Sequence, residues 1–111
     1  EVTISICDRI LDNEPEDEDA YYYRGLSNYE LKNYEEAIAD FTKALSINPT
    51  AVNIWRTRGD LYSKLSNYEK ALADFEEALH LDSKDTMTYN NRGLVYLDQN
   101  KAEPAKDRKV D

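Results

Sequence analysis

The chain has 111 residues, of which 41% are hydrophobic and 33% are charged, and its net charge is −9. This length is enough for one domain, and only three glycines and three prolines argue against a loop-rich or β-rich fold. No stretch approaches the roughly 20 apolar residues that cross a bilayer, and no signal segment opens the chain, so membrane association is not expected.

The acidic excess lies at the N-terminal end. Residues 1–20 carry 8 acidic and 1 basic residue, a net of −7, residues 21–100 carry 12 and 9, a net of −3, and residues 101–111 carry 3 and 4, a net of +1. A chain without a basic stripe is a poor candidate for binding nucleic acid or anionic lipid. The single Cys7 excludes an internal disulfide and points to a reducing, cytoplasmic compartment.

Residues 1–15 are predicted to form a helix that ends at Pro15. Next comes the acidic run NEPEDEDA, residues 13–20. A calcium loop would alternate Asp or Asn and place a glycine at the turn, and this run does neither. We interpret it as a linker whose Asp17, Glu18 and Asp19 favour the N-terminus of the following helix.

Residues 19–50 are predicted to form two helices. Ala37, Ile38, Phe41, Ala44 and Leu45 fall at i, i+1, i+4, i+7 and i+8, which is one face of an α-helix. A proline at position 49 ends that helix. The link that joins it to the earlier helix, about residues 19–32, is short, so the two helices must run antiparallel.

The same pattern returns 34 residues later, in residues 53–84, and again in residues 87–111. NYEEAIADFTKALSINP (33–49) realigns with NYEKALADFEEALHLDS (67–83). Cys7, Leu11 and Pro15 lie 34 residues before Phe41, Leu45 and Pro49, so residues 1–15 correspond to the second helix of an earlier unit. The chain does not begin with Met, and we expect it to be part of a longer protein.

The third unit begins like the others and then departs from them. Gly93 lies 34 residues after Gly59, but the second helix of this unit is weak, with Lys109 where the phenylalanine belongs. Pro104 is acceptable only in a first helical turn. We expect residues 103–111 to form a short or frayed helix.

Two recurrences predict contacts within each unit. Glycine costs about 1 kcal/mol in a helix relative to alanine, so Gly25 and Gly59 are expected to allow close approach of the small alanines of the paired helix. An arginine precedes each glycine, and Arg24 and Arg58 each lie 16 residues before an aspartate. We therefore expect an Arg–Asp pair between the helices of each unit. In the third unit Arg108 stands where that Asp would be, although Asp107 would serve if the loop were one residue shorter.

These residues resemble the tetratricopeptide repeat (TPR) family over about residues 19–100. The matching positions are Tyr21, Gly25, Ala37, Phe41, Ala44 and Pro49, then Trp55, Gly59, Tyr62, Ala71, Phe75 and Ala78. Asn28 and Ser83 depart from the family pattern, as do the arginines before the glycines. The resemblance implies an all-α fold, a right-handed α-solenoid of about six helices in antiparallel pairs.

The resemblance also implies where partners bind, because TPR-like arrays place their first helices on a concave wall. The side chains expected there differ between repeats, whereas the packing residues do not. They are Tyr22, Tyr23, Leu26 and Tyr29, then Arg56, Thr57 and Asp60, then Asn90, Asn91 and Leu94. Tyrosines offer apolar area and a hydroxyl, and Arg56 is expected to pair with a carboxylate of a partner.

Two functions remain open. One is a scaffold that binds a peptide or helix of a partner protein in the concave groove; the other is a structural role in which the repeats stack on further repeats or on another copy. The chaperone-binding TPR subtype uses a clamp of Lys, Asn and Arg, but Tyr22, Leu26 and Thr57 stand at three of those positions. We find no catalytic constellation, metal cluster or phosphate loop and expect neither enzymatic activity nor a cofactor.

Overall fold

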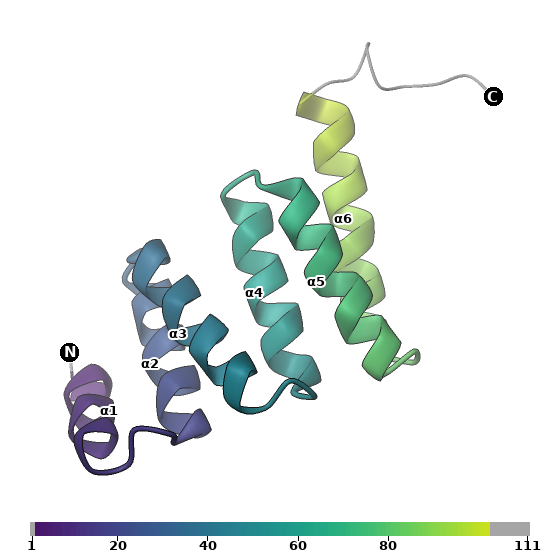
Figure 1. Ribbon diagram of the computed structural model, residues 1–111. Helices are drawn as coiled ribbons and strands as arrows, with labels where there is room; N and C mark the ends of the chain where they lie inside the picture. The colour runs from purple at the N-terminus through teal and green to yellow at the C-terminus, as the bar shows by residue number, and fades with distance from the viewer. Residues whose placement is uncertain (1, 103–111) are drawn as a thin grey trace.

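A computed structural model describes residues 2–102, which form six α-helices joined by short turns (Figure 1). The helices are α1 (Val2–Asn13), α2 (Glu18–Glu30), α3 (Tyr34–Ile47), α4 (Val52–Lys64), α5 (Tyr68–Leu81) and α6 (Thr86–Ala102). Each helix packs against the next one along the chain, so the helices form a row of antiparallel pairs. The predicted all-α fold is confirmed.

The C-terminal helix α6 is longer than its counterparts. A shift of 34 residues carries Lys64, the last residue of α4, onto Asp98, whereas α6 continues for four more residues to Ala102. The helix expected over residues 103–111 lies outside the described residues. Among residues 2–102, no helix combines the length and the apolar character that a bilayer crossing requires.

Each complete helix pair packs around one phenylalanine. Phe41 and Phe75 are fully buried. A Cβ placed on Gly25 would lie 2.7 Å from Cε1 of Phe41, and one placed on Gly59 would lie 2.7 Å from Cε1 of Phe75. The expectation that these glycines face the alanines of the paired helix is therefore wrong. The missing Cβ makes room for the edge of an aromatic ring.

The buried residues divide into two clusters along the row. The first, centred on Phe41, extends from α3 into α4. The second, centred on Phe75, joins α5 to α6 through the fully buried Val95. Small alanines complete both clusters, because close packing requires small residues beside large rings. Ala37 and Ala44 belong to the first cluster and Ala71 to the second, and all three have no exposed surface.

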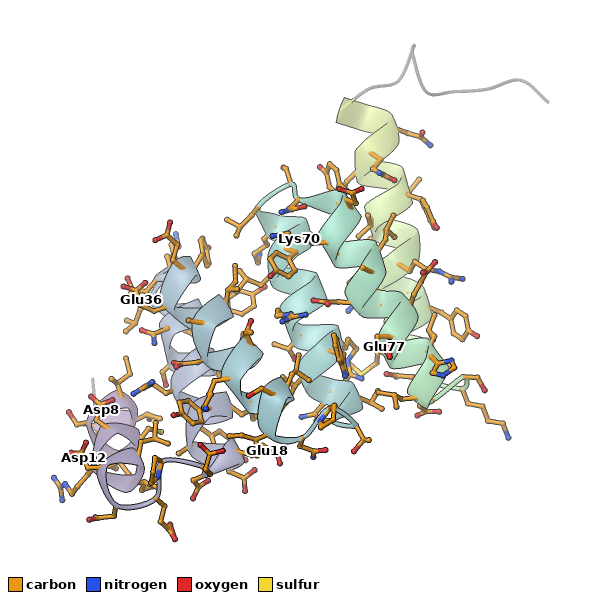
Figure 2. The ribbon with its side chains drawn as sticks, viewed as in Figure 1. Asp8, Asp12, Glu18, Glu36, Lys70 and Glu77 are labelled. Atoms are coloured by element: carbon orange, nitrogen blue, oxygen red, sulfur yellow. The ribbon has the colours of Figure 1, made fainter. Side chains whose placement is uncertain are left out.

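The acidic linker ends in a helix cap. Oδ1 of Asp17 accepts a hydrogen bond from the backbone N–H of Ala20 at 3.0 Å, and Glu18 and Asp19 occupy the first turn of α2. The first backbone N–H groups of a helix have no partner within the helix, so nearby carboxylates stabilise its start. The interpretation of this run as a linker and cap is confirmed. Figure 2 shows Glu18 near the end of α3, where Asn48 Nδ2 donates to both of its carboxylate oxygens at 3.2 Å.

The turns that follow α2 and α4 share one strained backbone position. Lys32 has φ 66° and Ser66 has φ 61°. The next residue in each turn, Asn33 or Asn67, donates its backbone N–H to the carbonyl five residues earlier, at 2.8 and 2.9 Å. This is the left-handed helix ending that glycine usually provides.

Replacing Lys32 or Ser66 with glycine is expected to stabilise the protein. A left-handed conformation costs an L-residue about 1–2 kcal/mol, and the greater freedom of glycine in the unfolded chain offsets part of this gain. We expect each variant to raise the free energy of unfolding by about 0.5–1 kcal/mol, measured by urea denaturation. Lys32→Ala is the matched control, because it removes the long side chain but keeps the Cβ. An equal gain from the alanine variant would contradict this explanation.

Candidate protein-interaction face

Arginines hold the framework on which the candidate face is built. Nε and Nη2 of Arg24 donate to the two carboxylate oxygens of Asp40 at 3.0 and 2.8 Å. Arg58 makes the same bidentate pair with Asp74, at 2.9 and 2.8 Å. These hydrogen bonds raise the pKa of both arginines, so they stay charged. The predicted Arg–Asp pairs are confirmed for both complete units.

Each of these arginines also reaches the preceding unit. Nη1 of Arg24 donates to Asp8 Oδ1 at 2.8 Å, and Nη1 of Arg58 donates to Thr42 Oγ1 at 2.9 Å. Figure 2 shows Asp8 on α1. Asp8 and Thr42 are 34 residues apart and occupy equivalent positions. The sequence did not predict this contact, because the two acceptors differ in residue type and so carry no visible repeat.

The aromatic residue that opens each unit is anchored by its polar atom. The hydroxyls of Tyr21 and Tyr89 and the indole N–H of Trp55 each donate to a backbone carbonyl six residues earlier, at 3.1, 3.0 and 2.8 Å. The acceptors are Pro15, Ser83 and Pro49. Because the carbonyl is the acceptor, serine serves as well as proline at this position. These aromatics therefore belong to the framework.

The next two tyrosines have different surroundings. Tyr22 is half-buried and packs against the first cluster, with its ring centroid 6.0 Å from that of Phe41. Tyr23 is 54% exposed, and its ring touches Tyr22 at a centroid distance of 5.4 Å. Leu26, one turn further along α2, is half-buried on the same cluster. Of the two tyrosines, Tyr23 is the one whose ring is mostly open to solvent.

Tyr29 and Asp60, both candidate site residues, contact each other. The Tyr29 hydroxyl donates to Asp60 Oδ2 at 2.8 Å and so joins α2 to α4. Its ring also meets Tyr34 edge-on, with the centroids 6.0 Å apart. Partial burial and the neighbouring carboxylate raise the pKa of Tyr29, which keeps the hydroxyl protonated as a donor.

Arg56 is paired within the chain rather than free for a partner. Its guanidinium donates to Asp85, and the two side chains are 19% and 12% exposed. Burial favours the neutral form of Asp85, but hydrogen bonds from Thr88 and Arg56 outweigh burial and lower its pKa. Thr57 donates to the Asn53 carbonyl at 2.7 Å. The expectation that Arg56 meets a partner carboxylate therefore needs correction, because Asp85 occupies it.

The candidate residues on α6 border a shallow hollow. Asn90 is exposed, Asn91 is half-buried and Leu94 is 51% exposed. Asn91 and Leu94 line, together with Asp60, an open hollow of about 320 Å³ between α4 and α6. Its other lining residues are Ser63, Lys64, Ser66, Tyr68 and Asp98. The structure thus brings three of the ten candidate residues to one hollow, whereas Tyr22, Tyr23 and Leu26 lie on α2.

Cys7 on α1 and His80 on α5 lie outside the first helices that carry the candidate residues. Cys7 is 4% exposed, and burial raises the pKa of its thiol, which makes it unreactive. His80 is exposed on α5. Within residues 2–102, no three His, Cys, Asp or Glu side chains are grouped to hold a metal ion.

The helix pairs, the repeated Gly–Phe contact and the Arg–Asp pairs define an all-α repeat protein. The tetratricopeptide repeat profile matches residues 18–51 and 52–85, and the chain belongs to this family. Mouse and human FK506-binding protein-like are 44% and 46% identical to it over 43 residues, which are 39% of this chain and 12% of each relative.

Solved structures of other proteins share the fold. The first TPR of Spaghetti (RPAP3), bound to the HSP90 peptide SRMEEVD, superposes with a TM-score of 0.81 at 21% identity, covering 86% of this chain and 76% of that one. MamA gives 0.82 at 20% identity, covering 86% and 56%. The Arabidopsis OM64 TPR domain gives 0.77 at 24% identity, covering 83% and 76%.

Proposed function

We propose that this chain is a protein-interaction scaffold that binds a segment of a partner protein along the face formed by α2, α4 and α6. One observation carries the proposal. The residues that repeat every 34 positions, such as Gly25 and Phe41, are buried in the framework, whereas the neighbouring first-helix positions change from repeat to repeat. Of these variable positions, the ones with exposed side chains, such as Tyr23 and Leu94, are free to specialise for a partner.

The chemistry of this face favours a partner segment with apolar anchors. The exposed ring of Tyr23 lies on α2 and the exposed Leu94 lies on α6. Between these two residues, Tyr29 is hydrogen-bonded to Asp60 and Arg56 to Asp85. These four side chains therefore already have partners within the chain. Buried aromatic anchors such as tyrosine carry much of the binding energy in such interfaces, and an exposed leucine adds apolar surface for a partner to bury.

An acidic C-terminal peptide is a poor fit to this face. Spaghetti (RPAP3) binds the HSP90 peptide SRMEEVD, and the family's carboxylate clamp needs free Lys, Asn and Arg side chains. Here Tyr22, Leu26 and Thr57 stand at three clamp positions. Arg56 is neutralised by Asp85. We infer that this chain binds SRMEEVD weakly or not at all.

Peptide display against the immobilised chain, followed by titration of the selected peptides, tests the proposed face. Tyr23→Ala and Leu94→Ala are expected to weaken binding at least tenfold, because each removes a large exposed side chain whose apolar surface the partner would bury. Tyr23 is a cleaner target than Tyr22, which also packs on Phe41.

The control variant is Glu76→Gln on α5, an exposed position away from the candidate face. It is expected to leave binding unchanged, and circular dichroism should show that all variants keep their helicity. The proposal fails if the selected peptides lose affinity for Glu76→Gln but not for Tyr23→Ala and Leu94→Ala. Tight binding of SRMEEVD would overturn the inference about apolar anchors.

Self-assembly is the alternative role, and exposed apolar side chains at both ends of the row favour it. Val2 and Ile6 on α1 are 74% and 50% exposed, and Met87 and Leu97 on α6 are 60% and 58% exposed. Sedimentation distinguishes the two functions. Concentration-dependent association of the chain alone supports stacking of copies, and a monomer supports the scaffold.

A further inference from the structure

A hollow of about 370 Å³ lies where α1, α2 and α3 meet, and we call it the α1–α3 hollow. None of the residues that line it belongs to the candidate face described above. They include Asp8 of α1, Arg24 and Asn28 of α2, and Glu36, Ala39 and Asp40 of α3. Asn28 is the residue of the first repeat that departs from the family pattern.

A tyrosine ring occupies the corresponding place in the second repeat. Tyr62 lies 34 residues after Asn28, and it packs against the cluster centred on Phe75. Its ring centroid is 5.6 Å from Cζ of Arg58, whose guanidinium also lies 5.2 Å from the centroid of the Trp55 ring. Arg58 therefore has two aromatic neighbours.

Arg24 has the first of these aromatic neighbours and lacks the second. Its guanidinium lies 5.6 Å from the centroid of the Tyr21 ring, and no other ring of residues 2–102 lies over it. Asn28 has no ring to offer, and its amide donates to Asp40 Oδ2 at 3.4 Å. The Arg24 side chain is 26% exposed, against 15% for Arg58. The α1–α3 hollow thus lies at the place of a ring that the first repeat lacks.

Neighbouring repeats of the row leave this side of the molecule open. In the second repeat, where α2 and α6 are described on either side, the residues equivalent to Asp8, Glu36 and Ala39 are all exposed. They are Thr42, Lys70 and Ala73. A helix that preceded α1 in the same register would stand to the α1–α3 hollow as α2 stands to this place in the second repeat. Because α2 leaves these residues exposed, such a helix would leave the α1–α3 hollow open.

The charges around the α1–α3 hollow favour a ring that comes with a basic neighbour. Of the three carboxylates that line it, two are bonded to Arg24, and that of Glu36 forms no ion pair within residues 2–102. In the second repeat Lys70 holds the position of Glu36 and places Nζ 5.5 Å from the centroid of the Tyr62 ring. Figure 2 shows Glu36 near the start of α3 and Lys70 near the start of α5. A partner that supplies a ring and a cation would match what the second repeat already holds, with the cation paired to Glu36.

We propose that the α1–α3 hollow is a second binding site, which takes the side chain of a tyrosine from a partner protein, with a lysine or arginine next to it in the partner sequence. The ring lies against the Arg24 guanidinium, as Tyr62 lies against Arg58, and the basic side chain pairs with Glu36. Arginine stacks on aromatic faces while the N–H groups in its plane remain bonded to carboxylates. This site is separate from the face on α2, α4 and α6, so either proposal can fail without the other.

Short capped peptides, titrated into the isotope-labelled chain, test the site. Acetyl-Lys-Tyr-Lys-amide is expected to shift the amide resonances of Asn28 and Ala39 and the Nε resonance of Arg24. It is expected to bind about tenfold more tightly than acetyl-Lys-Ala-Lys-amide, which lacks the ring. Equal binding of the two peptides would show attraction to an acidic surface without a ring site. Shifts confined to Tyr23 and Leu94 would place the peptide on the candidate face. Either result would overturn the proposal.

Two substitutions test the contacts. Asn28→Tyr introduces the residue of the second repeat and fills the hollow from within, so it is expected to weaken the tyrosine peptide about tenfold. Glu36→Lys is expected to weaken acetyl-Lys-Tyr-Lys-amide about threefold and not to weaken the neutral acetyl-Gly-Tyr-Gly-amide. Lys70→Glu is the matched control, because it makes the reverse exchange where Tyr62 already fills the space, and it is expected to leave both affinities unchanged.

Circular dichroism shows whether the variants keep their helices. Asn28→Tyr loses the hydrogen bond to Asp40, and if it fails to fold, Glu36→Lys and its control decide alone. Undiminished binding of acetyl-Lys-Tyr-Lys-amide to a folded Asn28→Tyr chain would refute the proposal. An equal loss in Glu36→Lys and Lys70→Glu would refute it as well.

Discussion

Replacing Gly59 with alanine is expected to lower the free energy of unfolding by about 1–2 kcal/mol. The new Cβ would lie 2.7 Å from Cε1 and 2.9 Å from Cδ1 of Phe75, and this ring is fully buried and has no space into which to move. Overpacking of this kind costs about 1–3 kcal/mol and at times more. The higher helix propensity of alanine offsets only about 1 kcal/mol of this overpacking cost. Urea denaturation followed by circular dichroism measures the difference.

The three equivalent glycines provide their own controls. Gly25→Ala is expected to cost as much as Gly59→Ala, because its Cβ would meet the Phe41 ring at the same 2.7 and 2.9 Å. Gly93→Ala makes no such contact with the residues that the structure describes and is expected to stabilise by up to about 1 kcal/mol. If all three substitutions changed stability by the same amount and in the same direction, the ring contact would not be the reason for the glycine.

Removing one carboxylate of the framework is expected to have an effect at least as large. Asp74 is 4% exposed at its side chain and Arg58 is 15% exposed. Asp74→Ala leaves this guanidinium with Thr42 as its remaining side-chain hydrogen-bond partner. Breaking a buried pair in this way costs about 3–5 kcal/mol. Because Arg58 keeps some contact with water, we expect about 3 kcal/mol, measured as the change in free energy of unfolding.

The equivalent pair in the first repeat gives a graded comparison. Arg24 is 26% exposed and has Asp8 as a second carboxylate partner, so Asp40→Ala is expected to lower the free energy of unfolding about half as much as Asp74→Ala.

Replacing both partners of the second-repeat pair, as in Arg58→Met with Asp74→Leu, is expected to return stability to within about 1 kcal/mol of the wild type, because no unpaired charge remains. A double variant as unstable as Asp74→Ala would contradict this reasoning.

A contact that both complete repeats make could be predicted from the sequence, because the same pair of residue types occurs twice, 34 residues apart. The spacing of 16 residues from Arg24 to Asp40 and from Arg58 to Asp74 is the plainest case. The glycines were also marked by the period, but their contact was misjudged. Periodicity shows which residues lie on a shared face, and the direction in which a side chain leans decides which atoms meet.

Contacts that occur once gave no such signal. Tyr29 and Asp60 are 31 residues apart, and Arg56 and Asp85 are 29 apart. Neither pair has a counterpart in another repeat. The sequence therefore marked Tyr29, Arg56 and Asp60 only as candidate partner-binding residues, and it did not single out Asp85. The first pair joins α2 to α4, and the second joins α4 to the residue just before α6. The sequence could therefore name candidate residues for this face, but it could not predict the pairing among them.

The third guanidinium nitrogen of Arg24 and Arg58 has a consequence for how the array comes apart. Each arginine ties its own repeat to the one before it, through Asp8 or Thr42, so neighbouring repeats are coupled one to the next as in a linear chain of units. Loss of either arginine is therefore expected to loosen two neighbouring repeats at once, so the described helices come apart in coupled units and not one helix at a time.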